Sequence, residues 1–216
     1  MKHSVNALKE LLDMYENGYF VDVGAASASL SNTLDLERRG WHGLCIDPHP
    51  IHCEWMRQNR SCIVEEAVCA KDVREETFIF QQPRPFLAAT HCQDIIERDR
   101  QDLWGSGLQC AMTDDYVQHV VKSVPTVISK IQTISLSDLL VKHQSPNVIE
   151  FLNIDVEGAE YEVLLGIDFS KYHFQVMAIE VWDHNLDSVV NLLQQNMYII
   201  YSCVKKDYVF ISGIKL

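Results

Sequence analysis

The sequence has little glycine and proline, the residues that interrupt regular structure. It contains 9 Gly and 6 Pro in 216 residues, whereas 47% of its residues are hydrophobic and 22% are charged. Collagen-like, low-complexity and disordered chains have far more glycine and proline or far fewer apolar residues, so these classes are excluded. A chain of this length and composition predicts a single domain over residues 1–216.

Basic residues are also scarce. The chain has 18 Lys and Arg against 30 Asp and Glu, which gives a net charge of −12. A surface of this sign repels polyanions, so nucleic acids and anionic membranes are poor partners. The densest basic stretches, residues 37–39 and 97–100, also contain acids and are typical of solvated faces.

Long apolar runs and paired cysteine motifs are missing. No stretch approaches the roughly 18 apolar residues of a membrane span, and the first six residues lack an apolar signal core. We therefore expect a soluble protein of the cytoplasm. The seven cysteines include no CxxC pair and no zinc-like spacing, so we expect reduced thiols. Cys45 and Cys62 fall in predicted buried strands and are expected to serve in packing.

Hydrophobic periodicity predicts alternating strands and helices. We predict helices over residues 4–17, 30–39, 159–165 and 186–195, one through Trp55 and Met56, and one whose N-cap is Ser135 or Ser137. We predict strands over residues 19–23, 44–47, 62–68, 77–80, 126–133, 148–154 and 176–181, and a terminal antiparallel hairpin of residues 197–204 and 208–211. This alternation predicts a doubly wound α/β sheet, with parallel units through the first 80 residues.

Residues 81–125 interrupt this rhythm. The segment opens with a proline-containing stretch and shows no clear period. We predict an insertion between the third and fourth core strands. Long irregular segments in compact domains are usually functional loops or lids, so we expect this one to select the substrate.

In a doubly wound sheet, a ligand lies beyond the carboxyl ends of the strands where the strand order reverses. Gly24 follows the first strand and lacks a Cβ, which lets backbone approach a ligand at a helix N-terminus. Asp47 ends the second strand, where a carboxylate can bind both hydroxyls of a ribose. This spacing suits an adenosine cofactor. A tight turn at Gly24 and a helix-capping role for Asp47 before Pro48 are the structural alternative.

Five segments of the sequence resemble the FkbM-type methyltransferase family. They are residues 20–25 (FVDVGA), 31–33 (SNT), 40–48 (GWHGLCIDP), 59–62 (NRSC) and 154–161 (IDVEGAEY). The resemblance runs from about Tyr19 to Val181. It implies a class I methyltransferase domain with a Rossmann-like sheet of seven strands, the last of them antiparallel, and it implies S-adenosylmethionine as cofactor.

The resemblance also implies a cofactor site. Asp22 and Gly24 would line its aminoacyl end, Asp47 would hold the ribose hydroxyls, and residues 66–68 would border the adenine. The residues expected at this site are Asp22, Gly24, Ala25, Ser27, Asp47, Pro48, Ala67 and Asp155.

The sequence departs from the family pattern directly after Ala25. The family commonly has Asn-Asp-Gly where this chain has Ala26-Ser27-Ala28. The missing acid and glycine fall in the loop expected to hold the methionine part of the cofactor, so we expect weakened binding. A catalytically degenerate methyltransferase-fold binding module is the alternative.

The expected reaction is methyl transfer to a hydroxyl group of a small molecule or a carbohydrate. An alcohol is a poor nucleophile until its proton leaves, so O-methylation needs a general base or a metal. Asp155, Glu157 and Glu180 can serve as the base or as oxygen ligands of a Mg²⁺-type ion. His184 and His91 are further candidate bases, and Trp104 and Trp182 are candidate platforms for a sugar or planar ring. The catalytic candidates are Asp155, Glu157, Glu180 and His184.

Two alternatives apply to this acidic set. Glu157 and Glu160 can instead complement the dipole of a first helical turn. An RNA ribose 2′-O-methyltransferase also uses this fold, but the acidic balance disfavours it. Asp155 and Glu180 also lack the lysine partners of a Lys-Asp-Lys-Glu arrangement.

Overall fold

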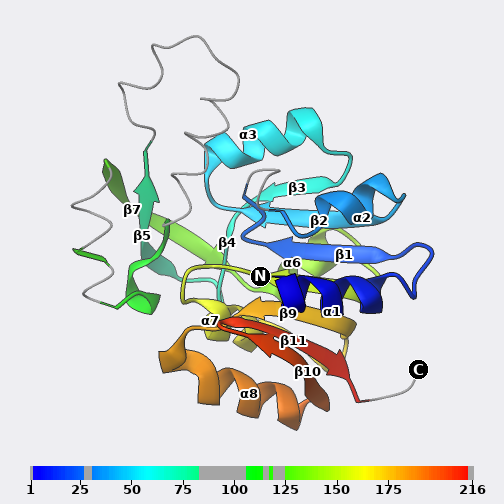
Figure 1. Ribbon diagram of the computed structural model, residues 1–216. Coiled ribbons are helices and arrows are strands. Elements are labelled where there is room, and N and C mark those ends of the chain that lie inside the picture. The colour runs from blue at the N-terminus through cyan, green and yellow to red at the C-terminus, as the bar shows by residue number, and fades with distance from the viewer. Residues whose placement is uncertain (1, 27–30, 83–105, 114–116, 119–124, 214–216) are drawn as a thin grey trace.

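A seven-stranded sheet forms the centre of the protein (Figure 1). The structure, a computed structural model, describes residues 2–26, 31–82, 106–113, 117–118 and 125–213. The strand order is β10 (Tyr198–Val204), β11 (Asp207–Ser212), β9 (His173–Glu180), β8 (Val148–Ile154), β1 (Tyr19–Val23), β2 (His42–Asp47) and β3 (Ile63–Glu66). Neighbouring strands from β9 to β3 pair in parallel, while β11 is antiparallel to β9 and β10. The predicted doubly wound sheet with an antiparallel last strand is confirmed.

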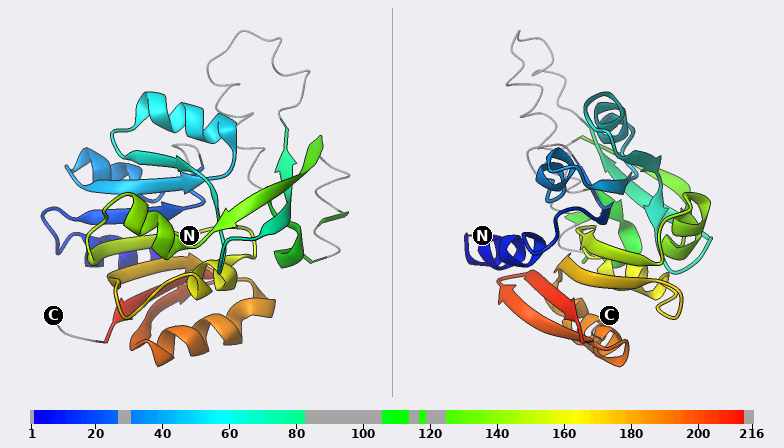
Figure 2. Two further views of the ribbon diagram at one scale, coloured as in Figure 1. Left: turned by 180° about the vertical axis from the view of Figure 1, so that it is seen from behind. Right: turned by 90° about the vertical axis from the view of Figure 1, so that its right-hand side faces the viewer.

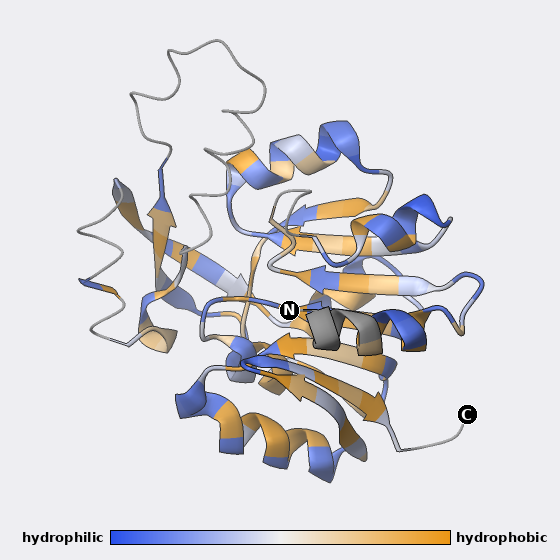
Figure 3. Cartoon of the chain, viewed as in Figure 1, coloured by the Kyte–Doolittle hydropathy of each residue, from blue (hydrophilic) through white to orange (hydrophobic). Residues whose placement is uncertain are grey.

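Helices cover both faces of this sheet (Figure 2). On one face lie α1 (Lys2–Leu12), α2 (Leu34–Arg38) and α3 (Pro50–Asn59), and on the other lie α6 (Leu136–Lys142), α7 (Glu160–Leu165) and α8 (Leu186–Gln195). Successive strand residues point to opposite faces. Phe20 therefore joins the cluster of Leu12 and Met56, while Val21 joins that of Leu139. Both faces of β1 are buried, which explains why its sequence is a nearly continuous apolar run (Figure 3).

A second, smaller sheet is built by the chain between β3 and β8. Its order is β4 (Val68–Cys69), β7 (Thr126–Ile134), β5 (Glu75–Gln81) and β6 (Gly107–Leu108). Phe78 and Leu108 form its own small core together with Ala159, which precedes α7. The sheet stands beyond the carboxyl ends of β1 and β2 (Figure 1), so it lies next to the region where the ligand was expected.

The second sheet corrects two predictions. The strand predicted at residues 77–80 does not extend the parallel units, because β5 pairs antiparallel with β7. The strand predicted over residues 62–68 is two strands, since the Ala67 amide donates to the Asp47 carbonyl oxygen at 3.3 Å and turns the chain between β3 and β4. The chain therefore leaves the main sheet after β3, and β4 and β5 belong to the second sheet.

Two helices on the α1–α3 face are shorter than predicted. Helix α1 ends at Leu12 rather than near residue 17, and Tyr15 instead packs edge-on against Trp41 with ring centroids 6.2 Å apart. Helix α2 begins at Leu34 with Thr33 as its N-cap, and in the preceding turn the Ser31 hydroxyl accepts from the Leu34 amide at 3.2 Å.

Other local predictions are confirmed. Strand β8 and helix α8 have the predicted bounds, and β10 and β11 form the predicted terminal hairpin. Ser135 is the N-cap of α6, where its hydroxyl accepts from the Asp138 amide at 3.0 Å. Within the described ranges, no helix combines the length and apolar character that a bilayer span requires.

Candidate active site

The loop after β1 approaches β8 very closely. Gly24 has φ +82°, and a Cβ at this position would lie 1.8 Å from the Asp155 carbonyl oxygen. The Asp155 amide also donates to the Val23 carbonyl at 3.0 Å, so the ends of β1 and β8 are joined. Glycine is thus required at residue 24 by the neighbouring backbone, independently of any ligand.

Ala26 has a conformation that suits the family's asparagine better than alanine. Its φ is +46°, in the left-handed region that asparagine and glycine adopt most readily. The Ala26 amide donates to Asp47 Oδ2 at 2.9 Å, which holds the loop against β2. The predicted cofactor residue Ser27 lies outside the described residues.

Asp47 connects three segments at the carboxyl end of β2. Its carboxylate accepts from the amides of Ala26 and His49, at 2.9 and 2.8 Å, and its Oδ1 lies 3.2 Å from His52 Nδ1. Its backbone carbonyl accepts from Ala67, so this predicted adenine neighbour is adjacent to Asp47. Pro48 is half-buried between Asp47 and α3. Asp47 does not cap α3, because the N-cap of this helix is His49, whose side chain accepts from the Ile51 amide. The Asp47 carboxylate instead joins the loops after β1 and β2, where the cofactor was predicted to bind.

His49 and His52 were not among the candidates from the sequence. Both are buried, and their rings lie 5.0 Å apart. His49 Nε2 is 2.8 Å from the Gln81 carbonyl oxygen, which links the end of β2 to the second sheet. Burial lowers the pKa of His49. Both histidines follow Asp47 within five residues, in the turn that contains Pro48 and Pro50. This closeness in the sequence is the signal that could have identified them.

Asp22 is fully enclosed by protein groups. Its Oδ2 accepts from the Thr33 hydroxyl at 2.6 Å and its Oδ1 from the Asn153 amide at 2.8 Å. Burial raises the pKa of Asp22, opposed by these hydrogen bonds and by the charge of Arg60. Asp22 and Ala25 are therefore both buried, and the Ala25 amide donates to the Ile46 carbonyl oxygen.

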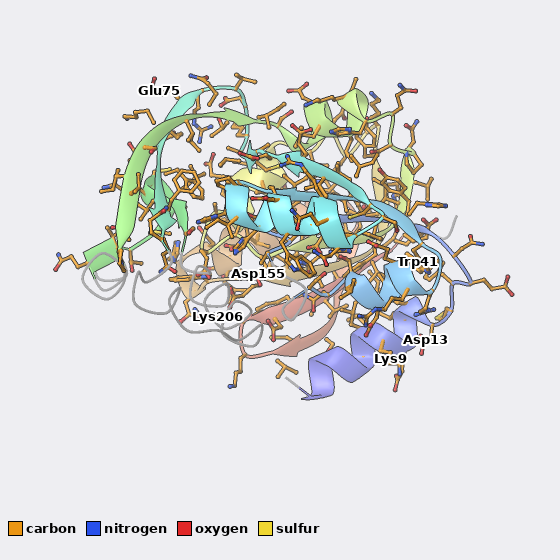
Figure 4. The ribbon with its side chains drawn as sticks, turned by 90° about the horizontal axis from the view of Figure 1, so that it is seen from above. Lys9, Asp13, Trp41, Glu75, Asp155 and Lys206 are labelled. Atoms are coloured by element: carbon orange, nitrogen blue, oxygen red, sulfur yellow. The ribbon has the colours of Figure 1, made fainter. Side chains whose placement is uncertain are left out.

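Asp155 and Glu180 form a carboxyl pair at the ends of β8 and β9. The two side chains share a hydrogen bond. Asp155 reaches solvent, yet protein atoms crowd its carboxyl, and this desolvation raises the pKa of Asp155 well above its usual range. The negative charges of Glu180 and Glu157 raise it further. Asp155 can therefore hold a proton at pH values where an isolated carboxyl is ionised. Figure 4 shows Asp155 far from Lys9 and Asp13 of the α1 end.

Two more glutamates follow Asp155 in the β8–α7 loop. Glu157 is half-buried with φ +56°. Glu160 is 0% exposed, and its Oε1 accepts from the Gly158 amide at 2.9 Å. Burial raises the pKa of Glu160 to about 7. Glu160 does begin α7, as the helix-dipole alternative expected, but it is not part of a solvated face.

The loop after β9 brings His184 to the same region. The Asn185 side-chain amide donates to the Gly158 carbonyl at 2.6 Å, so the β9–α8 and β8–α7 loops are joined. His184 is exposed and packs edge-on against Trp182, with ring centroids 6.1 Å apart. Lys206 Nζ lies 3.9 Å from the centroid of the Trp182 ring. His91 and Trp104 lie outside the described residues.

The second sheet packs onto these loops. A Cβ at Gly107 would meet Met112 and lie 3.4 Å from the Glu157 Cβ, and one at Gly158 would lie 2.8 Å from the Ala111 carbonyl oxygen. An open cavity of about 450 Å³ lies beside this contact and is lined by Glu76, Thr77, Gln109, Cys110, Met112, Val117 and Gln118. In the described part of the chain, no group of three or more His, Cys, Asp or Glu side chains is arranged to hold a metal ion.

The strand order, with its antiparallel last strand and its acidic loops at the carboxyl edge, defines a class I methyltransferase fold. A family model described as the methyltransferase FkbM domain matches residues 22–200. Because the match covers most of the chain, the protein belongs to the FkbM methyltransferase family. Methyltransferases of this kind generally use S-adenosylmethionine.

Other comparisons add little. Among solved structures, the precorrin-6Y C5,15-methyltransferase from Geobacter metallireducens GS-15 is similar, with a TM-score of 0.45 and 12% sequence identity. The alignment covers 96% of this chain and 85% of that one. No curated protein sequence matches this chain.

Proposed function

We propose that the protein is an S-adenosylmethionine-dependent O-methyltransferase that acts on a hydroxyl group of a small molecule or sugar. The observation that carries this proposal is the hydrogen-bonded pair of Asp155 and Glu180, next to the Gly24 loop. A hydroxyl group becomes a good nucleophile when a base removes its proton. A carboxyl with a raised pKa, such as that of Asp155, is a stronger base than an ordinary carboxylate, which suits this task near neutral pH.

The residues at this edge fit a cationic adenosine cofactor. The loops after β1, β2 and β8 are joined by the contacts of Gly24 with Asp155 and of Ala26 with Asp47. Asp47 accepts three hydrogen bonds in the structure, and a carboxylate has about four acceptor sites. Binding both ribose hydroxyls would therefore displace one of the three groups that contact this carboxylate. His52 is the most distant of them, at 3.2 Å. Glu157 and the pair of Asp155 and Glu180 supply negative charge for a cation. The cofactor, when bound, supplies a methyl group on a positively charged sulfur.

The reaction assigns two tasks to this chain. Glu180 and Asp155 accept the proton of the acceptor hydroxyl. The loops of both sheets hold the acceptor in line with the methyl group and exclude water, which is the principal requirement of a transfer that neutralises charge. The insertion, including the described residues 106–113 next to Glu157, selects the acceptor.

Calorimetric titration with S-adenosylmethionine and S-adenosylhomocysteine tests the cofactor assignment. We expect the parent protein to bind both ligands and Asp47→Asn to bind at least about tenfold more weakly, because the exchange removes a charged acceptor. Asp13→Asn is the matched control, since Asp13 is exposed and pairs with Arg39 far from the site. Equal affinity of Asp47→Asn and the parent would mean that Asp47 is not the ribose anchor.

Replacement of the base tests the reaction class. We expect Glu180→Gln to lower kcat by about 10²–10⁴ and to leave the affinity for S-adenosylhomocysteine unchanged. The measurement is S-adenosylhomocysteine release with a panel of sugars and hydroxylated small molecules. Exposed Glu54→Gln is the control. Full activity of Glu180→Gln would remove this carboxyl pair from the chemistry.

A second candidate function is a binding module that has lost catalysis. Ala26 favours it, because alanine occupies a left-handed position that the family fills with asparagine. This candidate predicts weak or absent cofactor binding by the parent protein in the same titration. Any methylated product would exclude it.

A further inference from the structure

Arg60 is a buried arginine on the α3 side of the sheet, outside every predicted site. Its side chain is 1% exposed, although it follows the last residue of α3. Its guanidinium donates to Glu37 Oε2 at 3.0 Å, to the Ser31 hydroxyl at 3.0 Å and to the Thr33 hydroxyl at 2.9 Å. It also lies over the Phe20 ring of β1, 5.6 Å from the centroid. Among the described residues, the guanidinium therefore donates only to the chain between β1 and α2 and to α2 itself.

The residues that Arg60 holds are also joined to the sheet. The Thr33 hydroxyl that accepts from Arg60 donates to Asp22 at 2.6 Å. The Asn32 amide donates to Asn153 Oδ1 at 3.0 Å, and Asn153 in turn donates to Asp22. Residues 31–33 are thus bonded to β1, to β8 and, through Arg60, to the end of α3.

These three residues end the loop whose other end holds the cofactor-site contacts. Gly24 and Ala26 fix the beginning of that loop against Asp155 and Asp47. Residues 31–33 fix its end. A loop fixed at both ends before a ligand arrives loses less conformational entropy on binding, which increases affinity. Burying a guanidinium is costly, and such a network is retained where it specifies one arrangement.

We infer that Arg60 is a positioning residue for cofactor binding, because it holds Ser31 and Thr33 against Asp22 and so fixes the end of the β1–α2 loop. This inference rests on the proposed function, since it assumes that the residues around Gly24, Ala26 and Asp47 bind S-adenosylmethionine. Arg60 itself touches neither the cofactor nor the reacting atoms.

Three variants test the inference by calorimetry with S-adenosylhomocysteine. Arg60→Met removes all three donors, and Arg60→Lys keeps the charge with fewer donors. Thr33→Val removes the shared hydroxyl at nearly constant volume. Arg38→Met is the control, because Arg38 is exposed on α2 and pairs only with Asp35 among the described residues. We expect Kd to rise at least about tenfold for Arg60→Met and Thr33→Val, less for Arg60→Lys, and not at all for Arg38→Met.

Kinetics separate positioning from general destabilisation. We expect Arg60→Met to raise the KM for S-adenosylmethionine while kcat at saturating cofactor stays within about threefold of the parent. The double variant Arg60→Met/Thr33→Val should bind no more weakly than the weaker single variant, because both changes break one network. If Arg60→Met does not fold, Thr33→Val and Arg60→Lys still carry the test.

The possible failures are distinguishable. Folded variants that bind with the parental Kd would overturn the inference and leave the proposed function intact. A loss of kcat at unchanged KM would also overturn it. If the parent protein itself binds neither ligand, the proposed function fails and this inference fails with it.

Discussion

Two acidic side chains at the carboxyl edge of the sheet have raised pKa values but differ in their exposure to solvent. Asp155 shares a hydrogen bond with Glu180 and reaches solvent, whereas Glu160 has no solvent contact. In the described part of the chain, Glu160 Oε2 has no hydrogen-bond partner. A carboxyl in this position is more stable when protonated. The two groups thus have raised pKa values for related reasons but different access to a substrate.

The pKa of Glu160 predicts a pH-dependent stability. The pKa is raised from 4.5 to about 7, so the folded protein binds this proton more tightly than the unfolded chain does. This contribution to the free energy of unfolding is complete below about pH 4.5 and is lost as the pH rises to about 7. As the pH rises from 5 to 8, we expect the parent to lose on the order of 3 kcal/mol of its free energy of unfolding relative to Glu160→Gln, which cannot ionise at this position. Denaturant unfolding at both pH values measures the difference.

Exposed Glu54→Gln is the control for this measurement, because its carboxyl is solvated in the folded and unfolded chains. A constant difference between Glu160→Gln and the parent at both pH values would contradict the raised pKa. His49 acts in the opposite direction. Its lowered pKa makes stability fall with acidification below about pH 6.5.

Among the elements, the second sheet has the clearest link to function. It packs on the acidic loops through Gly107 and Ala111, and it is joined to the end of β2 through Gln81 and His49. The sheet therefore borders both the predicted cofactor site and the carboxyl pair. This position supports the proposed role in acceptor selection, while the seven-stranded sheet ends in the loops that are proposed to bind the cofactor.

Shortening the insertion tests that role. The Gln81 amide donates to the Ser106 hydroxyl at 2.9 Å, and Ile79 pairs with Gly107, so the described residues on either side of 83–105 lie close together. We expect a variant in which a short Gly-Ser linker replaces residues 83–105 to fold and to bind S-adenosylhomocysteine like the parent. Its acceptor methylation should fall by roughly 10²-fold, because the acceptor is no longer oriented.

A variant with a Gly-Ser segment of the original length is the control for loop length. Thermal unfolding and calorimetry verify the fold and the cofactor site of both variants. Methylation at the parental rate by the shortened protein would show that acceptor selection resides elsewhere.

Taken over the entire chain, the charge argues against a nucleic acid substrate. The net charge of −12 opposes the approach of a polyanion, and nucleic acid affinity depends on neutralising phosphates. We expect no binding of structured or single-stranded RNA at about 0.15 M salt, measured by fluorescence anisotropy. Binding that weakens steeply as salt increases would instead favour the RNA ribose 2′-O-methyltransferase alternative.

Local sequence patterns were sufficient for much of the main sheet. Strand β8, helix α8 and the terminal hairpin follow from apolar periodicity and turn residues, because each element buries one face or both in a regular way. The acidic residues at the strand ends followed from the same pattern, since parallel strands end at one edge. The family resemblance then indicated which of these residues belong together.

Long-range contacts determined the rest. Whether residues 75–81 join the main sheet depends on pairing with β7, whose residues lie about 50 positions later. The glycine at residue 24 is required by Asp155, Asp22 is enclosed by Thr33 and Asn153, and Arg60 bonds residues nearly 30 positions earlier. No local propensity encodes such contacts, because each depends on which segments the packed core brings together.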